Sequence, residues 1–296
     1  RPVCTFFEAY WQDKFSNNVL PLRVGNDVAT INDVMGVIEI LSSRREYTQS
    51  NPFVVILGKG DHPIYSSWTD PIIGGVHYTT LGITRSNITF VGEGKDTTTI
   101  LGGFAVVEQE NIMFKQMTVT NTMSGCSGIE LRGAVEIKLI DVAVVNCCEH
   151  GLYVLGTSRL VATRSEMSNN GGSGLRLFND ITNAPDIPTC ILGDFNTWSA
   201  TSGPAIVHLK DVIMHHNSNV GVNVYGNSTV NIHGNATAIH STNIGLLAYY
   251  SAKVLIHLPS DHNTSFNNEG GDRIWSTSNL STQHNRGYIT NVEVED

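Results

Sequence analysis

The chain has 296 residues, of which 41% are hydrophobic and 15% are charged, and this length can bury a large core as one elongated solenoid or as two ordinary domains. Its formal net charge is -9 and its 18 Lys and Arg residues are scattered, which argues against the basic face that nucleic-acid binding requires. No apolar run approaches the roughly 18 residues of a membrane span, so no such span is expected.

The N-terminal segment, residues 1–52, contains one expected helix. Residues 29–41 carry apolar side chains at helical spacing and are followed by three charged residues at 44–46. An amphipathic helix in this position would cap the open end of a solenoid. Because the chain starts at Arg1 rather than Met and lacks a signal-peptide apolar region, we expect a soluble, processed product or a fragment.

A short phrase, Gly-aliphatic-x-aliphatic, recurs through the centre of the chain. It begins at Gly128, Gly151, Gly174, Gly221 and Gly245. These glycines are separated by 23, 23, 47 and 24 residues. The long interval corresponds either to two coils or to one coil with an inserted loop, and we favour a loop at residues 179–202.

Each repeat also carries a polar corner residue and a second strand. The corner residues stand five positions before four of the glycines, at Asn146, Asn169, His216 and His240. Upstream of each corner, apolar residues alternate with polar ones. Coils of this kind bury their apolar faces only by stacking, with their strands paired in parallel. The sequence therefore predicts an all-β fold, a single right-handed parallel β-helix (solenoid) over residues 53–258.

The start of the predicted β-helix resembles a known superfamily. Residues 53–64 and 88–102 follow the amphipathic helix with the patterns V-x-L-x-x-G-x-H-x-I and I-x-F-x-G-x-G-x-x-x-T-x-I. This order is similar to the N-terminal part of the pectate-lyase-like superfamily of right-handed β-helix proteins, and the resemblance covers about residues 24–257. It is specific for fold but not for function, since the superfamily includes lyases, hydrolases, epimerases, phage tailspikes and non-catalytic surface proteins.

The last part of the chain resembles a narrower group. Residues 245–258 and the polar stretch 267–271 are most similar to uncharacterised β-helix proteins of algae and large algal viruses. The polar tail, residues 259–296, contains Trp275 and a candidate last strand at 288–294. We expect this tail to cover the distal end, because an uncovered β-helix would expose a strand edge.

The outward positions of the repeats form a candidate binding strip. The residue x between the two aliphatic residues of each phrase is expected to face outward. Along the solenoid these residues are Glu130, Tyr153, Arg176, Asn223 and Leu247, about 4.8 Å apart between adjacent coils. The carboxylate, phenol, guanidinium and amide of the first four would suit a sugar-binding strip. We favour the alternative, an ordinary solvated face with Glu130 and Arg176 loosely paired.

Weaker candidates for catalysis lie beside this strip. Cleavage of uronic-acid polymers needs a base for the sugar C5 proton and a cation for the carboxylate, so Tyr153 or His150 would act with Arg164 or Arg176. The motif sets of polygalacturonases, pectate lyases and mannuronan epimerases are absent from the sequence. Their absence weakens every named enzyme class.

No metal site and no cofactor are expected. The five cysteines lack paired C-x-x-C spacing and are predicted to be buried thiols, with a Cys126–Cys148 disulfide across coils as the alternative. Among the histidines of the last third, a stacked corner pair of His216 and His240 is favoured over a metal site. The glycine-rich phrase at 92–95 precedes no helix, which argues against a phosphate cradle.

Three functions remain open. The preferred one is a non-catalytic structural or glycan-binding β-helix of an extracellular or virion surface, with polysaccharides or assembly proteins as partners. The alternative is a polysaccharide lyase, hydrolase or epimerase that acts on an acidic polysaccharide through the face with Tyr153 and Arg176. The third is an assembly component that docks through the 179–202 loop, which contains Phe195 and Trp198.

Overall fold

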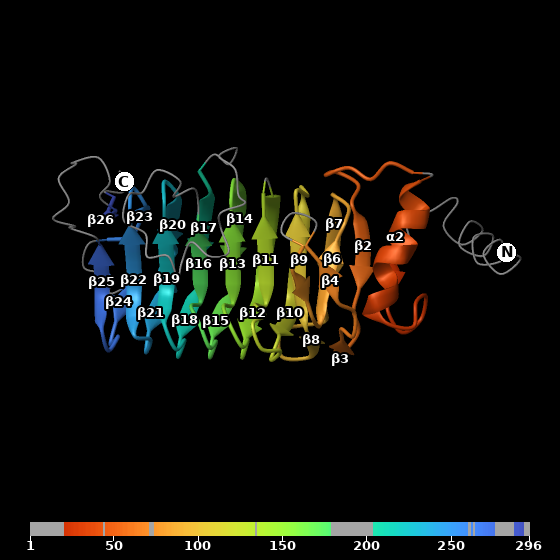
Figure 1. Ribbon diagram of the computed structural model, residues 1–296, viewed down its shortest axis with the longest axis horizontal. Coiled ribbons are helices and arrows are strands. Elements are labelled where there is room, and N and C mark those ends of the chain that lie inside the picture. Colours follow the sequence, from red (N-terminus) through yellow and green to blue (C-terminus); the bar gives the residue numbers. More distant parts are fainter. Residues whose placement is uncertain are drawn as a thin grey trace, which may run out of the picture.

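The structure of the protein is a computed structural model. It describes residues 21–43, 45–70, 74–133, 135–178, 204–259, 262, 264–275 and 287–292. The chain winds into an elongated solenoid in which successive coils lie side by side along one axis (Figure 1). A single parallel β-helix was the predicted fold, and the strand pairings confirm it.

Two parallel sheets run the length of the solenoid. Among the described residues, the larger sheet follows the order β1 (Leu22–Arg23), β2 (Phe53–Ile56), β7 (Ile88–Val91), β10 (Ile112–Thr120), β12 (Val135–Val145), β14 (Ser158–Thr163), β17 (Ile206–Lys210), β20 (Thr229–His233), β23 (Lys253–Ile256) and β26 (Tyr288–Asn291). Its side branches are β3 (Gly60–Pro63), β8 (Thr98–Leu101), β15 (Glu166–Ser168), β18 (Ile213–His215), β21 (Ala238–His240) and β24 (Ser265–Phe266).

The smaller sheet contains the repeated glycine phrases. Its strands are β6 (Thr80–Ile83), β9 (Gly103–Val107), β11 (Ile129–Arg132), β13 (Leu152–Leu155), β16 (Leu175–Phe178), β19 (Val220–Tyr225), β22 (Ile244–Tyr249) and β25 (Gly271–Trp275). A separate antiparallel hairpin pairs β4 (Trp68–Thr69) with β5 (Val76–His77).

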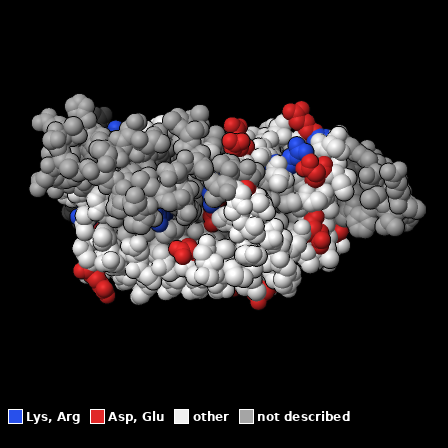
Figure 2. Space-filling model, viewed as in Figure 1, with Lys and Arg blue, Asp and Glu red and all other residues white. Residues whose placement is uncertain are grey.

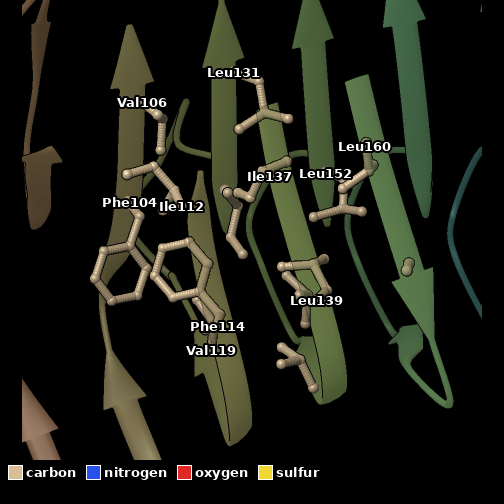
Figure 3. Packing of buried hydrophobic residues seen from close by; sticks show 14 of the residues in the cluster. Phe104, Val106, Ile112, Phe114, Val119, Leu131, Ile137, Leu139, Leu152 and Leu160 are labelled. Atoms are coloured by element: carbon tan, nitrogen blue, oxygen red, sulfur yellow. The ribbon is translucent and has the colours of Figure 1, made fainter. Parts of the chain in front are cut away.

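The core lies between the two sheets. The two aliphatic residues of each glycine phrase are fully buried, as at Leu152 and Val154. Three phenylalanines from adjacent coils pack together near the N-terminal end, with the Phe104 and Phe114 ring centroids 4.6 Å apart and Phe90 5.3 Å from Phe114. Figure 3 shows Phe104 and Phe114 together with aliphatic side chains of the core. The period-2 pattern therefore predicted which residues face inward.

The recurring glycine is required by the closeness of neighbouring coils. A Cβ on Gly151 would lie 2.8 Å from the carbonyl oxygen of Gly174, and one on Gly174 would lie 2.9 Å from that of Gly221. Beside these glycines, Asn170 and Asn217 are buried and linked by a 2.9 Å hydrogen bond in which Asn170 Nδ2 donates. Only glycine leaves room for the next coil at these positions.

The corner residues adopt the left-handed backbone expected of them, with one correction. Asn146, Asn169 and His216 have φ of 56°, 56° and 52°. In the next coil the left-handed residue is Ser241, at φ 56°, and not the predicted His240. His240 instead pairs in register with His215, because the interval from β18 to β21 is one residue longer than the 24 residues that separate the glycines.

The interval of 47 residues is one coil with an insertion, as predicted. Strand β16 pairs directly with β19, so that Leu175 lies opposite Val222 with no coil between them. The predicted inserted loop, with Phe195 and Trp198, lies outside the described residues.

A helix covers the N-terminal end of the solenoid. After a short 3-10 turn, η1 (Ile31–Asp33), helix α2 (Val34–Ser42) buries Val34, Val37 and Ile38 against the first coil. Figure 1 shows α2 lying across this end, which confirms the predicted amphipathic helix. Among the described helices, none is long and apolar enough to cross a membrane.

Candidate functional site

The predicted outward residues stand in line on the smaller sheet. Glu130 pairs in register with Tyr153, Tyr153 with Arg176, and Arg176 with Asn223. These four residues are called the polar column below. Because Glu130 is only 4% exposed and Asn223 only 5%, the favoured prediction of an ordinary solvated face is wrong. Tyr153 and Arg176, in the middle of the column, are half-buried.

A second column, which the sequence analysis did not identify, lies two residues further along each strand. It contains the aromatic residues Phe178, Tyr225 and Tyr249, which pair in register. Their ring centroids are 5.4 Å apart at both steps. These three residues are called the aromatic column below. Counting two residues beyond each x position would have found it, since the same register aligns both columns.

The β4–β5 hairpin packs over the N-terminal end of this face. Trp68 covers Gly82, where a Cβ would lie 2.0 Å from the Trp68 ring. The Trp68 ring lies 5.4 Å from that of His77 on the paired strand. Gly82 is aligned with Ala105 of the next coil, so the hairpin lies on the outer side of the smaller sheet.

Buried charges attach this hairpin to the sheet. Arg132 Nη1 lies 2.7 Å from Asp70 Oδ2 and its Nη2 lies 3.0 Å from Glu130 Oε2, while His77 Nδ1 is 3.4 Å from Glu130 Oε1. Burial alone would raise the pKa of Glu130, but His77 and Arg132 outweigh it and lower that pKa. Glu130 is therefore a paired carboxylate, and the expected loose pairing with Arg176 is wrong.

His150 lies in the middle of the face beside the polar column. The Ser173 backbone N–H donates to its Nδ1 at 2.8 Å, and Arg176 Nη1 lies 3.2 Å from its Nε2. Its ring lies 5.5 Å from that of Tyr153, and the Arg176 guanidinium carbon lies 5.8 Å from the same Tyr153 ring. Burial, and then the charge of Arg176, lower the pKa of His150 to about 4.

The structure brings together three of the four candidates for acid–base chemistry. Tyr153, His150 and Arg176 are in contact, whereas Arg164 makes a two-point ion pair with Asp141 at 2.7 and 2.8 Å, so the expectation that Arg164 serves the site is wrong. A neutral imidazole that accepts a hydrogen bond at Nδ1 carries its proton on Nε2 and has no second nitrogen lone pair. His150 therefore lacks the free nitrogen that a general base needs.

The histidines of the last third are stacked on the larger sheet. The predicted pair was His216 with His240, but the parallel stack joins His215 to His240, with centroids 5.4 Å apart and an interplanar angle of 9°. His216 meets both rings edge-on. The described residues contain no group of three or more His, Cys, Asp or Glu side chains placed to hold a metal ion.

The described cysteines are free thiols. Cys126 and Cys147 are buried, as predicted, but Cys148 is exposed, so the prediction of a buried thiol is wrong there. Because all three are free thiols, the alternative Cys126–Cys148 disulfide is not formed. Burial raises the pKa of Cys147 to about 12. Cys4 and Cys190 lie outside the described residues.

Charged residues are sparse on the face seen in Figure 2. Blue Lys and Arg atoms are scattered among white ones over its described part, and no continuous blue patch is visible there. This distribution matches the scatter of Lys and Arg along the sequence.

Comparison with known proteins identifies the family. No curated protein matches the chain. Among solved structures, a pectin methylesterase mutant in complex with hexasaccharide IV has 12% identity over 90% of this chain and 92% of its own, with a TM-score of 0.43. ORF18 of Geobacillus virus E2 has 13% identity over 96% of this chain and 62% of its own, with a TM-score of 0.41. The family profile described as "Right handed beta helix region" matches residues 79–237 and 127–287, and the chain therefore belongs to the right-handed β-helix family.

Proposed function

We propose that the protein is a non-catalytic, glycan-binding β-helix of an extracellular or virion surface, and that the outer face of its smaller sheet binds the glycan. The observation that carries this proposal is the juxtaposition of the polar and aromatic columns in one register. Sugar rings present apolar faces that pack on aromatic side chains, while their hydroxyl groups need donors and acceptors. The two columns offer both along several consecutive coils, which suits a polymer.

The two ends of the face differ in how many polar groups are available to a ligand. At the N-terminal end, Glu130 is occupied by the ion pairs of the hairpin. Farther along, Tyr225 and Tyr249 are half-buried, and the Oδ1 atom of Asn223 is buried without a hydrogen-bond partner among the described residues. An unsatisfied buried acceptor is costly, and a sugar hydroxyl would supply its donor. The proposed site therefore runs from Tyr153 toward Tyr249.

The chemistry of the face favours binding over cleavage. Hydrolysis of a glycosidic bond ordinarily requires two carboxyl groups, one of them available as an acid. Asp70 and Glu130, which lie beside the N-terminal end of the face, share the guanidinium of Arg132. His150 is also engaged at Nδ1, so Asp70, Glu130 and His150, among the described residues, offer no free acid–base pair on this face.

A binding experiment tests the proposal. Oligosaccharides of several classes, neutral and acidic, would be titrated into the protein by calorimetry. For a ligand that binds, Tyr249→Ala is expected to weaken the affinity about three- to tenfold through loss of one aromatic stack. Tyr65→Ala is the matched control, because Tyr65 is 78% exposed and lies outside both columns.

Two results would overturn the proposal. Binding that Tyr249→Ala and Tyr65→Ala weaken equally, or no binding to any glycan class, would contradict the placement on this face. Release of an unsaturated product from an acidic polysaccharide, followed by its absorbance and abolished by Arg176→Ala, would show the alternative, a polysaccharide lyase.

A further inference from the structure

The position of the proton on His150 is determined by its surroundings. The Ser173 N–H donates to Nδ1 at 2.8 Å, so this nitrogen is unprotonated and a neutral ring carries its proton on Nε2. Gly172 leaves room for the ring, since a Cβ at that position would lie 2.3 Å from Nδ1. His150 is only 7% exposed, which favours the neutral imidazole, and its Nε2 lies 3.2 Å from Arg176 Nη1.

Arg176 therefore faces a donor rather than an acceptor. Its Nη1 lies 3.2 Å from His150 Nε2, and guanidinium nitrogens only donate hydrogen bonds. The Nε atom of Arg176 is buried and has no hydrogen-bond partner among the described residues. The guanidinium carbon lies 5.8 Å from the ring centroids of both Tyr153 and Phe178.

The charge of Arg176 also lacks a counter-ion in the part of the chain that is described. The nearest carboxylate on the column, Glu130, is bound by His77 and Arg132. A half-buried charge with no partner is unfavourable, and so are two donors that point at each other. An incoming oxygen anion would relieve both conditions.

We propose that His150 and Arg176 form the seat for a carboxylate of the ligand. One carboxylate oxygen can accept from His150 Nε2–H and from Arg176 Nη1, because these two donors are only 3.2 Å apart. The same group supplies a charge opposite to that of the guanidinium. This inference rests on the proposed glycan-binding function and deepens it: the ligand is a polysaccharide whose sugars bear carboxylates.

The test compares one polymer in two forms. Polygalacturonate and its carboxyl-reduced, neutral counterpart would be titrated into the full chain by calorimetry, with dextran sulfate as a second anion. The wild-type protein is expected to bind the carboxylated form at least tenfold more tightly than the reduced form. Arg176→Gln is expected to abolish this preference, while Arg159→Gln, an exposed arginine on the larger sheet, leaves it unchanged.

A second variant separates the seat from general charge attraction. His150→Asn keeps an oxygen that accepts the Ser173 N–H but has no donor in the place of Nε2–H. We expect it to reduce the preference for the carboxylated polymer while Arg176 keeps its charge. Thermal unfolding of each variant at neutral pH provides the folding control.

The outcomes are distinguishable. Equal binding of carboxylated and reduced polymers, with Tyr249→Ala still weakening both, overturns the carboxylate seat and leaves the glycan-binding face standing. Tighter binding of dextran sulfate than of the carboxylated polymer also overturns the assignment to carboxylate. Independently of any ligand, ¹⁵N NMR of the imidazole should report a proton on Nε2 of His150, and a proton on Nδ1 would remove the basis of the inference.

Discussion

Acid should destabilise this protein partly through His150. The imidazole of an unfolded chain has a pKa of about 6.5, whereas burial and Arg176 lower the pKa of His150 to about 4 in the folded protein. As the pH falls below about 6.5, His150 becomes protonated in the unfolded state but stays neutral in the folded state. The contribution of His150 to stability is therefore fully present above that pH and is lost as the pH falls toward 4.

The magnitude follows from the gap between the two pKa values. Each unit of pKa difference corresponds to about 1.4 kcal/mol. Protonation of His150 should therefore lower the unfolding free energy by about 3 kcal/mol between pH 7 and pH 4. His150 is only 7% exposed, so solvent screening reduces this value little. The loss is comparable to a large part of the stability of an ordinary domain.

Urea unfolding followed by far-ultraviolet circular dichroism, at pH 7 and at pH 4, measures the effect. His150→Asn does not titrate in this range and keeps an acceptor for the Ser173 N–H. The wild-type protein should lose about 3 kcal/mol more than this variant between the two pH values. Equal losses would refute the reasoning, because the other histidines and the carboxylates titrate in both proteins.

Three further predictions concern glycines and cysteines. Gly151→Ala should lower the unfolding free energy by about 1–3 kcal/mol in urea titrations, because its Cβ would lie 2.8 Å from the next coil's carbonyl oxygen. Gly36→Ala should raise it by about 0.5–1 kcal/mol, since Gly36 lies in helix α2 with nothing within 4 Å of the added Cβ; a decrease would contradict the helix assignment. In the native protein Cys148 should react with a thiol reagent well before Cys147, whose pKa of about 12 and burial protect it, as mass spectrometry of the labelled peptides would show.

The sequence predicted those features that depend on spacing alone. In a solenoid, residues one coil apart become neighbours, so counting from one glycine to the next places Tyr153 beside Arg176 without knowledge of the rest of the fold. The same count fails where a coil has an extra residue, as it did at His240 and Ser241. A change of one residue in a strand or corner is invisible to a repeat search because the apolar pattern on either side is unchanged.

The partners of the outward side chains were not predictable in this way. Asp70 lies 62 positions before Arg132 in the sequence, in a hairpin that lies outside the repeat pattern, yet the two form a 2.7 Å ion pair. The hairpin's strands have only two residues each, Trp68–Thr69 and Val76–His77, which is too short for a periodic signal. Burial of an outward column depends on such covering segments, and no count along the coils shows where they lie.

Two residues in the same column can therefore have different roles, because different segments of the chain cover them. Glu130 and Arg176 stand in one column two rungs apart, but Glu130 is satisfied by His77 and Arg132, whereas Arg176 faces the Nε2–H of His150. Glu130→Gln should therefore loosen the hairpin and lower stability, whereas Arg176→Gln should change ligand preference with little effect on folding. A residue in line with a binding site belongs to the site only where the protein itself has left its hydrogen-bonding capacity unused.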